Sequence, residues 1–170
     1  VNSIMLDPNG ELIGRVIEYR KDMLLDKWCR ISKARAKRPK LPELKTANYY
    51  NILHKMTINN CPLCKENIFK VTTRFATKFN LGDRLVHGNC VLFPNYYPFA
   101  KYHLVGALPE EHSTLFRDIP LNSLYNCMYA SVDFFNKIHE LDKSAKYAHI
   151  NCNYMPPAAA SIIHPHIQVI

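Results

Sequence analysis

The sequence predicts an α+β domain in which a mostly antiparallel sheet carries one long helix on a face. Three observations support this prediction. Asn9-Gly10 separates two apolar stretches, 3–6 and 12–17, and a second hairpin within 84–93 turns at Gly88-Asn89. From about Asn122 to Leu141, apolar residues recur at helical spacing.

The remaining elements are predicted from shorter patterns. Strands are expected at 27–31, 102–108 and 147–152, with a short helix within 43–57 and a last strand that includes 164–168. Asn122 is the expected N-cap of the long helix. The helix is expected to face the sheet with Leu124, Cys127, Met128, Val132, Phe135, Ile138 and Leu141.

Length and composition indicate one domain. The chain has 170 residues, 48% of them hydrophobic, and no apolar run long enough to span a membrane or act as a signal segment. Six cysteines are too few for a disulfide scaffold, so we expect a reducing compartment, the cytoplasm, with Cys29, Cys90, Cys127 and Cys152 as small core residues. Because the chain begins at Val1 and ends within a strand pattern, residues 1–170 are expected to be a fragment of a longer chain.

The positive charge is concentrated in one segment. The net charge is +8, from 22 basic and 14 acidic residues, and eight of the cations lie between Lys27 and Lys45. This segment favours a phosphate-bearing partner, either a nucleotide or a nucleic acid. A solvated basic surface is the alternative interpretation.

The segment His164-Pro165-His166-Ile167-Gln168 suits phosphate chemistry. In an extended strand, His164, His166 and Gln168 share one face. One imidazole can bind a metal or orient its neighbour, the second can act as a nucleophile, and the amide can donate to a phosphate oxygen. A half-buried strand with two hydrogen-bonded histidines is the alternative.

Cys61-Pro62-Leu63-Cys64 has the spacing of a metal-binding knuckle. Two thiolates leave a tetrahedral Zn²⁺ site two ligands short, and the chain has no second pair of this kind. The other ligands must be single Cys or His residues, and the eight histidines are all candidates.

Six separated motifs together resemble the N-terminal half of the galactose-1-phosphate uridylyltransferase family, in the histidine-triad superfamily. In chain order the motifs are Lys27-Trp28 with Arg35-Ala36-Lys37-Arg38-Pro39, the knuckle 61–64, Phe93-Pro94-Asn95-Tyr96, Pro109-Glu110-Glu111-His112-Ser113, Asn153, and Ser161 with His164-Pro165-His166-Ile167-Gln168. Two glycines of the family pattern are replaced, by Met155 and by Ala159. The resemblance implies a histidine-triad-like half of a two-repeat fold.

The resemblance also implies a role for each matched residue. It implies that Cys61, Cys64, His112 and His164 bind Zn²⁺, that His166 is the nucleophile, and that Gln168 binds the attacked phosphoryl group. It implies nucleotide or phosphate contacts from Asn95 with the adjoining Tyr96, Asn153 and Ser161, and phosphate contacts from Arg35 and Arg38 across the interface of a homodimer.

The function that this resemblance implies is nucleotidyl transfer in galactose and nucleotide-sugar metabolism. A nucleoside diphosphate sugar would form a covalent nucleotidyl-histidine, which a sugar 1-phosphate then accepts. Gln168 stands where histidine-triad hydrolases have a third histidine, which is typical of the transferase and phosphorylase branch. The alternative enzyme is an ADP-sugar or diadenosine tetraphosphate phosphorylase that uses phosphate.

A different class of function uses the same features without catalysis. A zinc-stapled nucleic-acid-binding module would use the basic segment 27–45, with Tyr96, Tyr97 and Phe99 as stacking aromatics. The sequence does not connect these aromatics with the basic segment.

Overall fold

The computed structural model describes residues 1–42, 45–108 and 111–170. Two predictions fall partly outside the described residues. The first two positions of the predicted helix segment 43–57 lie outside the described residues. So do Pro109 and Glu110 of the motif 109–113.

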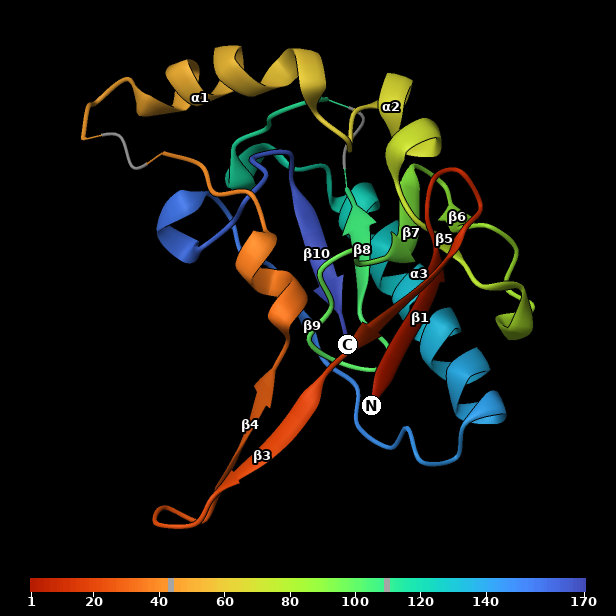
Figure 1. The fold of residues 1–170 in the computed structure, drawn as a ribbon. Coiled ribbons are helices and arrows are strands. Elements are labelled where there is room, and N and C mark those ends of the chain that lie inside the picture. Colours follow the sequence, from red (N-terminus) through yellow and green to blue (C-terminus); the bar gives the residue numbers. More distant parts are fainter. Residues whose placement is uncertain (43–44, 109–110) are drawn as a thin grey trace.

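The centre of the fold is a five-stranded sheet (Figure 1). Every neighbouring pair in it is antiparallel. The spatial order of its strands is β6 (Leu85–His87), β7 (Cys90–Pro94), β8 (Leu104–Ala107), β10 (His166–Val169) and β9 (Ile150–Asn151). The predicted α+β class and antiparallel sheet are confirmed.

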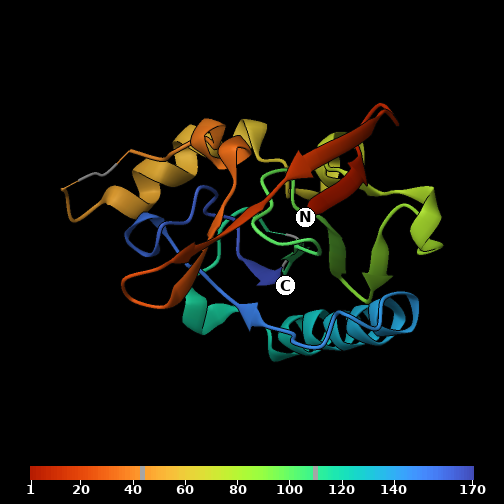
Figure 2. The same cartoon turned by 60° about the horizontal axis from the view of Figure 1, so that its bottom comes forward.

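The long helix α3 (Leu121–Leu141) covers one face of this sheet (Figure 2). Its predicted position is confirmed, but Pro120 rather than Asn122 is the N-cap. Met128, Val132 and Leu141 are exposed, so their predicted contact with the sheet was wrong. The buried face is centred instead on Cys127, Phe134 and Ile138, and small or polar residues complete it, namely Ser123, Asn126, Ala130 and Ser131.

The β6–β7 turn is fitted closely to α3. Gly88 has a φ of +55°, and a Cβ there would lie 2.2 Å from the side-chain amide nitrogen of Asn126. That amide donates to Oδ1 of Asn89, whose own amide donates to Ser123 Oγ. Glycine is therefore required at position 88 for both backbone conformation and space.

A disulfide joins Cys90 of β7 to Cys127 of α3. Both residues are buried as predicted, but their pairing was not predicted. Cys29 and Cys152 are exposed, so the prediction that they belong to the core was wrong. Both lie on short segments near an edge of the fold, where side chains are not enclosed by a second layer.

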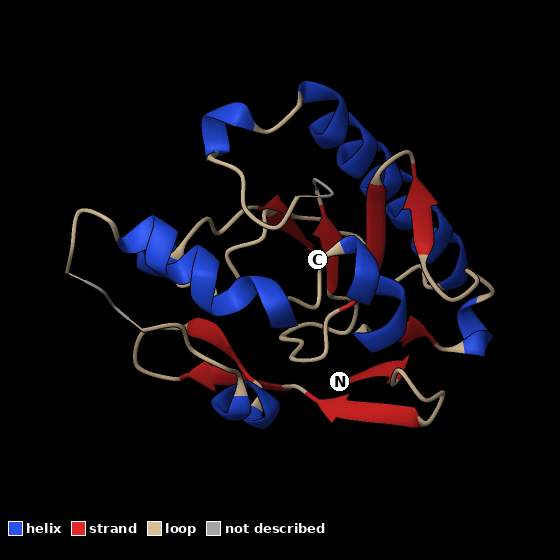
Figure 3. Cartoon of the chain, turned by 90° about the horizontal axis from the view of Figure 1, so that it is seen from above, coloured by secondary structure: helices blue, strands red, loops and turns tan. Residues whose placement is uncertain are grey.

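Smaller elements lie on the face opposite α3. The strands of the large sheet lie between α3 and the hairpin of β1 (Asn2–Leu6) and β2 (Leu12–Val16), which β5 (Arg74–Phe75) extends to three strands (Figure 3). Two short helices lie on the same side, α1 (Tyr49–Thr57) and α2 (Lys65–Val71). The 3₁₀ helices are Lys33–Lys37, Ile58–Asn60, Thr77–Phe79, Phe116–Asp118 and Pro156–Ala158.

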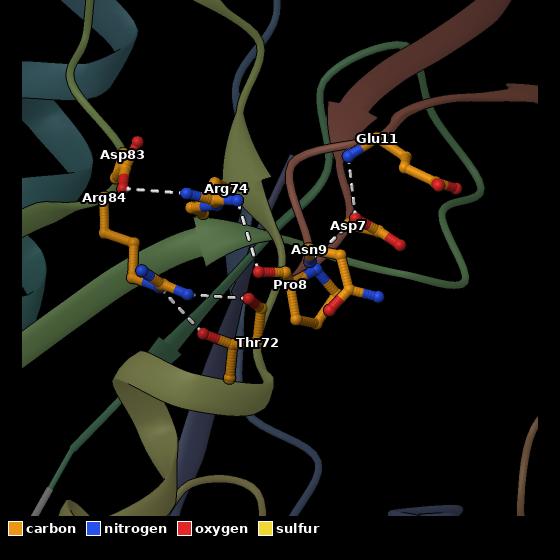
Figure 4. A network of polar contacts seen from close by, with 8 residues as sticks. All are labelled: Asp7, Pro8, Asn9, Glu11, Thr72, Arg74, Asp83 and Arg84. Carbon is orange, nitrogen blue, oxygen red and sulfur yellow. Dashed lines mark hydrogen bonds and ion pairs between the residues drawn. The ribbon is translucent and has the colours of Figure 1, made fainter.

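A polar network fixes the β1–β2 turn to the segment that follows α2 (Figure 4). Arg74 donates to the carbonyl of Pro8 at 3.2 Å and pairs with Asp83. Arg84 donates to both the hydroxyl and the carbonyl oxygen of Thr72. The network holds Pro8 and Thr72, which both line the large cavity described below.

The strands β3 (Glu18–Asp22) and β4 (Lys27–Ile31) form a separate hairpin arm that projects from the fold (Figure 1). The strand at 27–31 was predicted, but β3 was not, because its sequence Glu-Tyr-Arg-Lys-Asp has no apolar alternation. The predicted strand 147–152 is reduced to β9. Among the described residues, no helix is long and apolar enough to cross a bilayer.

Candidate active site

Four side chains from distant segments of the chain meet in one buried cluster. The ligand atoms of Cys61, Cys64, His112 and His164 all lie within 4.8 Å of one another, and all four residues are buried. Cys64 Sγ lies 3.3 Å from Nδ1 of His112 and 3.7 Å from Nδ1 of His164. In a tetrahedral zinc site the corresponding sulfur–nitrogen edge is about 3.6 Å. The cluster therefore has the donors and spacing to hold a metal ion.

The knuckle is shaped by the start of α2. The amide of Asn67 donates to the carbonyl of Cys61 at 2.9 Å, and the backbone N–H groups of Asn67 and Ile68 donate to the carbonyl of Cys64. Burial raises the pKa of both thiols, that of Cys64 to about 12, and the adjacent Cys61 adds to the effect there. Two neighbouring thiolates therefore need a bound cation to be stable at neutral pH.

Thr57 orients the His112 ring. The Thr57 hydroxyl donates to the carbonyl of Leu53 at 2.7 Å, so its oxygen accepts from Nε2 of His112 at 2.8 Å. The ring proton is therefore on Nε2, and the Nδ1 lone pair faces the thiols. Thr57 was not predicted as a site residue, since only its contact with the distant His112 shows its role.

The chain bends at His164, before β10 begins at His166. His164 therefore lies outside the strand that carries His166 and Gln168, and its ring lies beside the thiol of Cys64. His166 and Gln168 do alternate with Ile167 and Val169, which belong to the core under α3. The two histidines consequently lie in different environments.

The His166 ring is held by a backbone carbonyl that lies just before its strand. Its Nδ1 donates to the carbonyl of His164 at 2.8 Å. The pKa of His166 is lowered, chiefly by burial and also by the charge of Arg38. The ring is therefore neutral at pH 7, with its proton on Nδ1 and a lone pair on Nε2.

A cavity of about 550 Å³ adjoins the cluster on the side of the sheet opposite α3. Cys61 and His112 reach its wall. The structure also brings every residue predicted for catalysis or substrate binding to this cavity, namely Arg35, Arg38, Asn95, Tyr96, Asn153, Ser161, His166 and Gln168. Residues separated by more than a hundred positions thus surround one space. The volume is in the range of small-molecule and cofactor sites.

Two arginines supply positive charge to this cavity. Arg35 donates to the carbonyl of Tyr97 at 2.8 Å, and Arg38 donates to the carbonyl of Ala159 at 3.0 Å. Burial, with the nearby charge of Arg38, lowers the pKa of Arg35. The guanidinium groups of Arg30 and Arg35 also lie over the ring of Phe99, which joins the basic segment to the aromatic loop.

The loop that leads to Ser161 has an unusual backbone. Met155 has φ 68° and ψ 162°, and Ala159 has φ 61°. Both conformations favour glycine. These are the two positions where the pattern that the sequence resembles has glycine.

Asn151, on the cavity wall, and His103, behind Gln168, were not predicted as site residues. Asn151 lines the wall, and its amide donates to Oδ1 of Asn153 at 3.2 Å. His103, a buried residue to which the sequence assigned no role, donates to Gln168 from behind. The sequence did contain one signal for His103: in the predicted strand 102–108 it would share a face with Val105.

Comparison with known proteins gives distant likenesses. No protein-family model matches the chain. An uncharacterized protein of Archaeoglobus fulgidus is 29% identical over 161 residues, which cover 95% of this chain and 46% of that protein. The chain thus spans about half the length of this curated relative.

Solved structures similar to the chain include the following three. A histidine triad protein from Clostridium difficile has a TM-score of 0.44 and 18% identity, over 65% of this chain and 89% of that one. An HIT family hydrolase from Legionella pneumophila Philadelphia 1 has a TM-score of 0.38 and 15% identity, over 51% and 76%. An ADP-glucose phosphorylase from Arabidopsis thaliana with bound ADP-glucose has a TM-score of 0.45 and 19% identity, over 91% and 48%.

Proposed function

We propose that this domain transfers a nucleotidyl group through a covalent bond to His166. The supporting observation is the hydrogen bond from His166 Nδ1 to the His164 carbonyl, which leaves Nε2 as the nucleophilic atom. His166 is on the wall of a cavity that also contains two arginines and an amide, the groups that bind phosphate.

In the first proposed step, Nε2 of His166 attacks the α-phosphorus of a nucleoside diphosphate sugar. A P–N bond forms, the P–O bond to the β-phosphate breaks, and the sugar phosphate leaves with that electron pair. In the second step, a phosphate oxygen of the acceptor attacks the same phosphorus and the P–N bond breaks. The carbonyl of His164 stabilises the Nδ1–H of the ring while the ring carries positive charge.

The cavity residues have complementary roles in this proposal. Gln168 donates a hydrogen bond to the phosphoryl oxygens, and Arg35 and Arg38 offset the charge that spreads over them. Asn95, Tyr96, Asn153 and Ser161 contact the nucleotide or its phosphates.

We propose Zn²⁺ as the ion held by Cys61, Cys64, His112 and His164. Four protein ligands would leave no open position, so the ion would be structural, fixing His164 and through its carbonyl the ring of His166. All chemical steps would remain with the protein side chains.

For the substrates we propose UDP-glucose and a hexose 1-phosphate, as in galactose metabolism, and a homodimer as the active form. The six sequence motifs support this choice. An ADP-sugar or diadenosine tetraphosphate phosphorylase is the second candidate, because the cavity groups that bind phosphate suit inorganic phosphate as an acceptor equally well.

The test is covalent labelling. The protein is incubated with UDP-glucose or ADP-glucose labelled at the α-phosphate and quenched in alkali, where phosphohistidine survives. We expect label on the wild type and on His139→Asn, an exposed control on α3, but not on His166→Asn. Label that persists in His166→Asn, or its absence from the wild type with every donor, would contradict the proposal.

Product analysis separates the two enzyme candidates. The labelled protein is chased with galactose 1-phosphate or with inorganic phosphate. Release of a nucleotide sugar by the first acceptor alone supports the transferase, and release of a nucleoside diphosphate by phosphate supports the phosphorylase. Salt-dependent oligonucleotide binding without labelling would instead favour the nucleic-acid module.

A further inference from the structure

We infer that His103 is a positioning residue that sets the orientation of the Gln168 amide, so that its NH₂ group rather than its carbonyl oxygen is presented to the substrate. This inference rests on the proposed function for its catalytic meaning. The orientation itself follows from hydrogen bonds within the described part of the chain.

The tautomer of His103 is fixed by the backbone. The ring is almost fully buried, and the N–H of Phe99 donates to its Nδ1 at 3.1 Å. Because a backbone N–H can only donate, Nδ1 is the unprotonated nitrogen and the ring proton is on Nε2. Burial lowers the pKa of His103 to about 4, so this neutral form is retained at pH 7.

The His103 proton is directed at Gln168. Nε2 lies 2.7 Å from Oε1 of Gln168, and this contact is therefore a hydrogen bond from the ring to the amide oxygen. The register supports the contact, because Gln168 pairs with Val105 in β8 and His103 directly precedes the first residue of that strand.

Asn95 is fixed in the same way and acts on the same oxygen. The N–H of Tyr97 donates to Oδ1 of Asn95 at 2.8 Å, so the other end of this amide is its NH₂ group. That NH₂ group donates to Oε1 of Gln168 at 2.9 Å. Two donors, each aligned by a backbone N–H, thus converge on one acceptor. The Asn95 amide nitrogen also lies 3.2 Å from His103 Nε2, but with the ring proton on Nε2 this contact joins two donors and is not a hydrogen bond.

The reversed orientation of Gln168 is unfavourable. Its NH₂ group would then face the Nε2–H of His103 and the NH₂ of Asn95, three donors without an acceptor. With Oε1 engaged by both neighbours, the NH₂ group is what Gln168 offers to the cavity. Phosphoryl oxygens only accept hydrogen bonds, so a flipped amide would present an oxygen that repels them.

The experiment measures single-turnover formation of nucleotidyl-His166 in four variants: His103→Phe, His103→Gln, Gln168→Ala and the double variant His103→Phe/Gln168→Ala. We expect His103→Phe to slow this step by about tenfold with little change in KM, since one aligned donor is lost. We expect His103→Gln to restore most of the rate, because its Nε2 can donate from nearly the same place.

The double variant distinguishes positioning from general damage. If His103 acts through Gln168, then His103→Phe should have no further effect once Gln168 is alanine. An equal fold-loss in both backgrounds, or no rescue by His103→Gln, would overturn the inference. Thermal unfolding of each variant shows that the fold is retained.

A failure of the proposed function can be told apart from a failure of this inference. Absence of label on the wild type would contradict the function alone. The side-chain NH₂ resonances of Gln168 then test its orientation directly by NMR. We expect one sharp pair in the wild type and in His103→Gln, and shifted or exchange-broadened signals in His103→Phe. Unchanged signals in His103→Phe would overturn the inference.

Discussion

The two faces of the five-stranded sheet differ in the kind of interaction that orders their side chains. Between the sheet and α3, apolar side chains such as Leu92, Phe134 and Ile167 pack together, and the Cys90–Cys127 disulfide joins the two layers. Towards the cavity, His103 and His166 are buried and each is held by a backbone group. The first face stabilises the fold, and the second aligns protons and lone pairs.

This difference means that substitutions on the two faces should be separable. A change under α3 should lower the free energy of unfolding but leave the nucleotidylation rate of the folded protein intact. A change behind the cavity should lower the rate more than the stability. The predictions below test this separation, beginning with the largest expected effect on stability.

The largest effect is expected for Phe134→Ala. The ring is 1% exposed and stacks on Phe75, so truncation should lower the unfolding free energy by about 4 kcal/mol. Urea denaturation measures this change. Val132→Ala on the exposed side of the same helix is the matched control and should change stability by less than about 0.5 kcal/mol. Similar losses in both variants would contradict the observed orientation of α3.

Reduction of the Cys90–Cys127 disulfide should have the next largest effect. The bond closes a loop over a sequence separation of 37, so its loss should destabilise the fold by about 3 kcal/mol. Denaturation with and without a phosphine reductant measures the change. The variant Cys90→Ala/Cys127→Ala should be insensitive to the reductant, and any residual sensitivity would come from the other cysteines. An equally insensitive wild type would show that the bond does not form.

The free energy of unfolding should decrease as the pH falls, because His103 is buried in its neutral form behind the cavity. The pKa of His103 is lowered to about 4, chiefly by burial and also by Arg35 and Arg30. The unfolded chain, with a pKa near 6.5, binds the proton more readily between these values. Stability from neutral His103 is therefore complete above about pH 6.5 and lost as the pH falls towards 4, by at most about 3 kcal/mol.

The difference between wild type and His103→Phe isolates this contribution. Burial also lowers the pKa values of His112 and His166, and their effects are common to both proteins. We expect the stability of the wild type to fall more steeply than that of His103→Phe between pH 6.5 and 4. Parallel curves would show that His103 titrates normally.

The smallest effect is a gain in stability on the cavity side. Ala159 has φ 61°, so Ala159→Gly should relieve strain and stabilise the protein by up to about 1 kcal/mol. Ala158→Gly is the control, because position 158 lies in a 3₁₀ turn outside the left-handed region and should lose stability. The same sign for both variants in thermal unfolding would contradict the assigned backbone at 159.

Elements with a repeating local pattern were predictable from the sequence. Short, contiguous sequence patterns predicted the hairpin at Asn9-Gly10, the turn at Gly88-Asn89 and the helix that ends at Leu141. The strand β3 was missed because only its pairing with β4 makes it a strand. Met128 and Val132 were misplaced because apolar spacing alone does not show which side of a helix the sheet approaches.

The candidate site was predictable only where its residues recur in a known motif. The four cluster residues were named from the resemblance, since spacing leaves all eight histidines open. His103 and Thr57 carry no motif. Their roles depend on hydrogen bonds to residues 65 and 55 positions away, which no local pattern contains.

The contact between Thr57 and His112 has a thermodynamic consequence. Thr57 is the last residue of α1, and among the described residues of this helix only Leu53 is buried. The helix is thus attached weakly by packing and additionally by a ligand of the candidate metal centre. Linkage is reciprocal, so an ion that immobilises the imidazole would also resist detachment of this helix, and undocking of the helix would loosen the ion. Amide exchange along α1 would then serve as a gauge of metal loading.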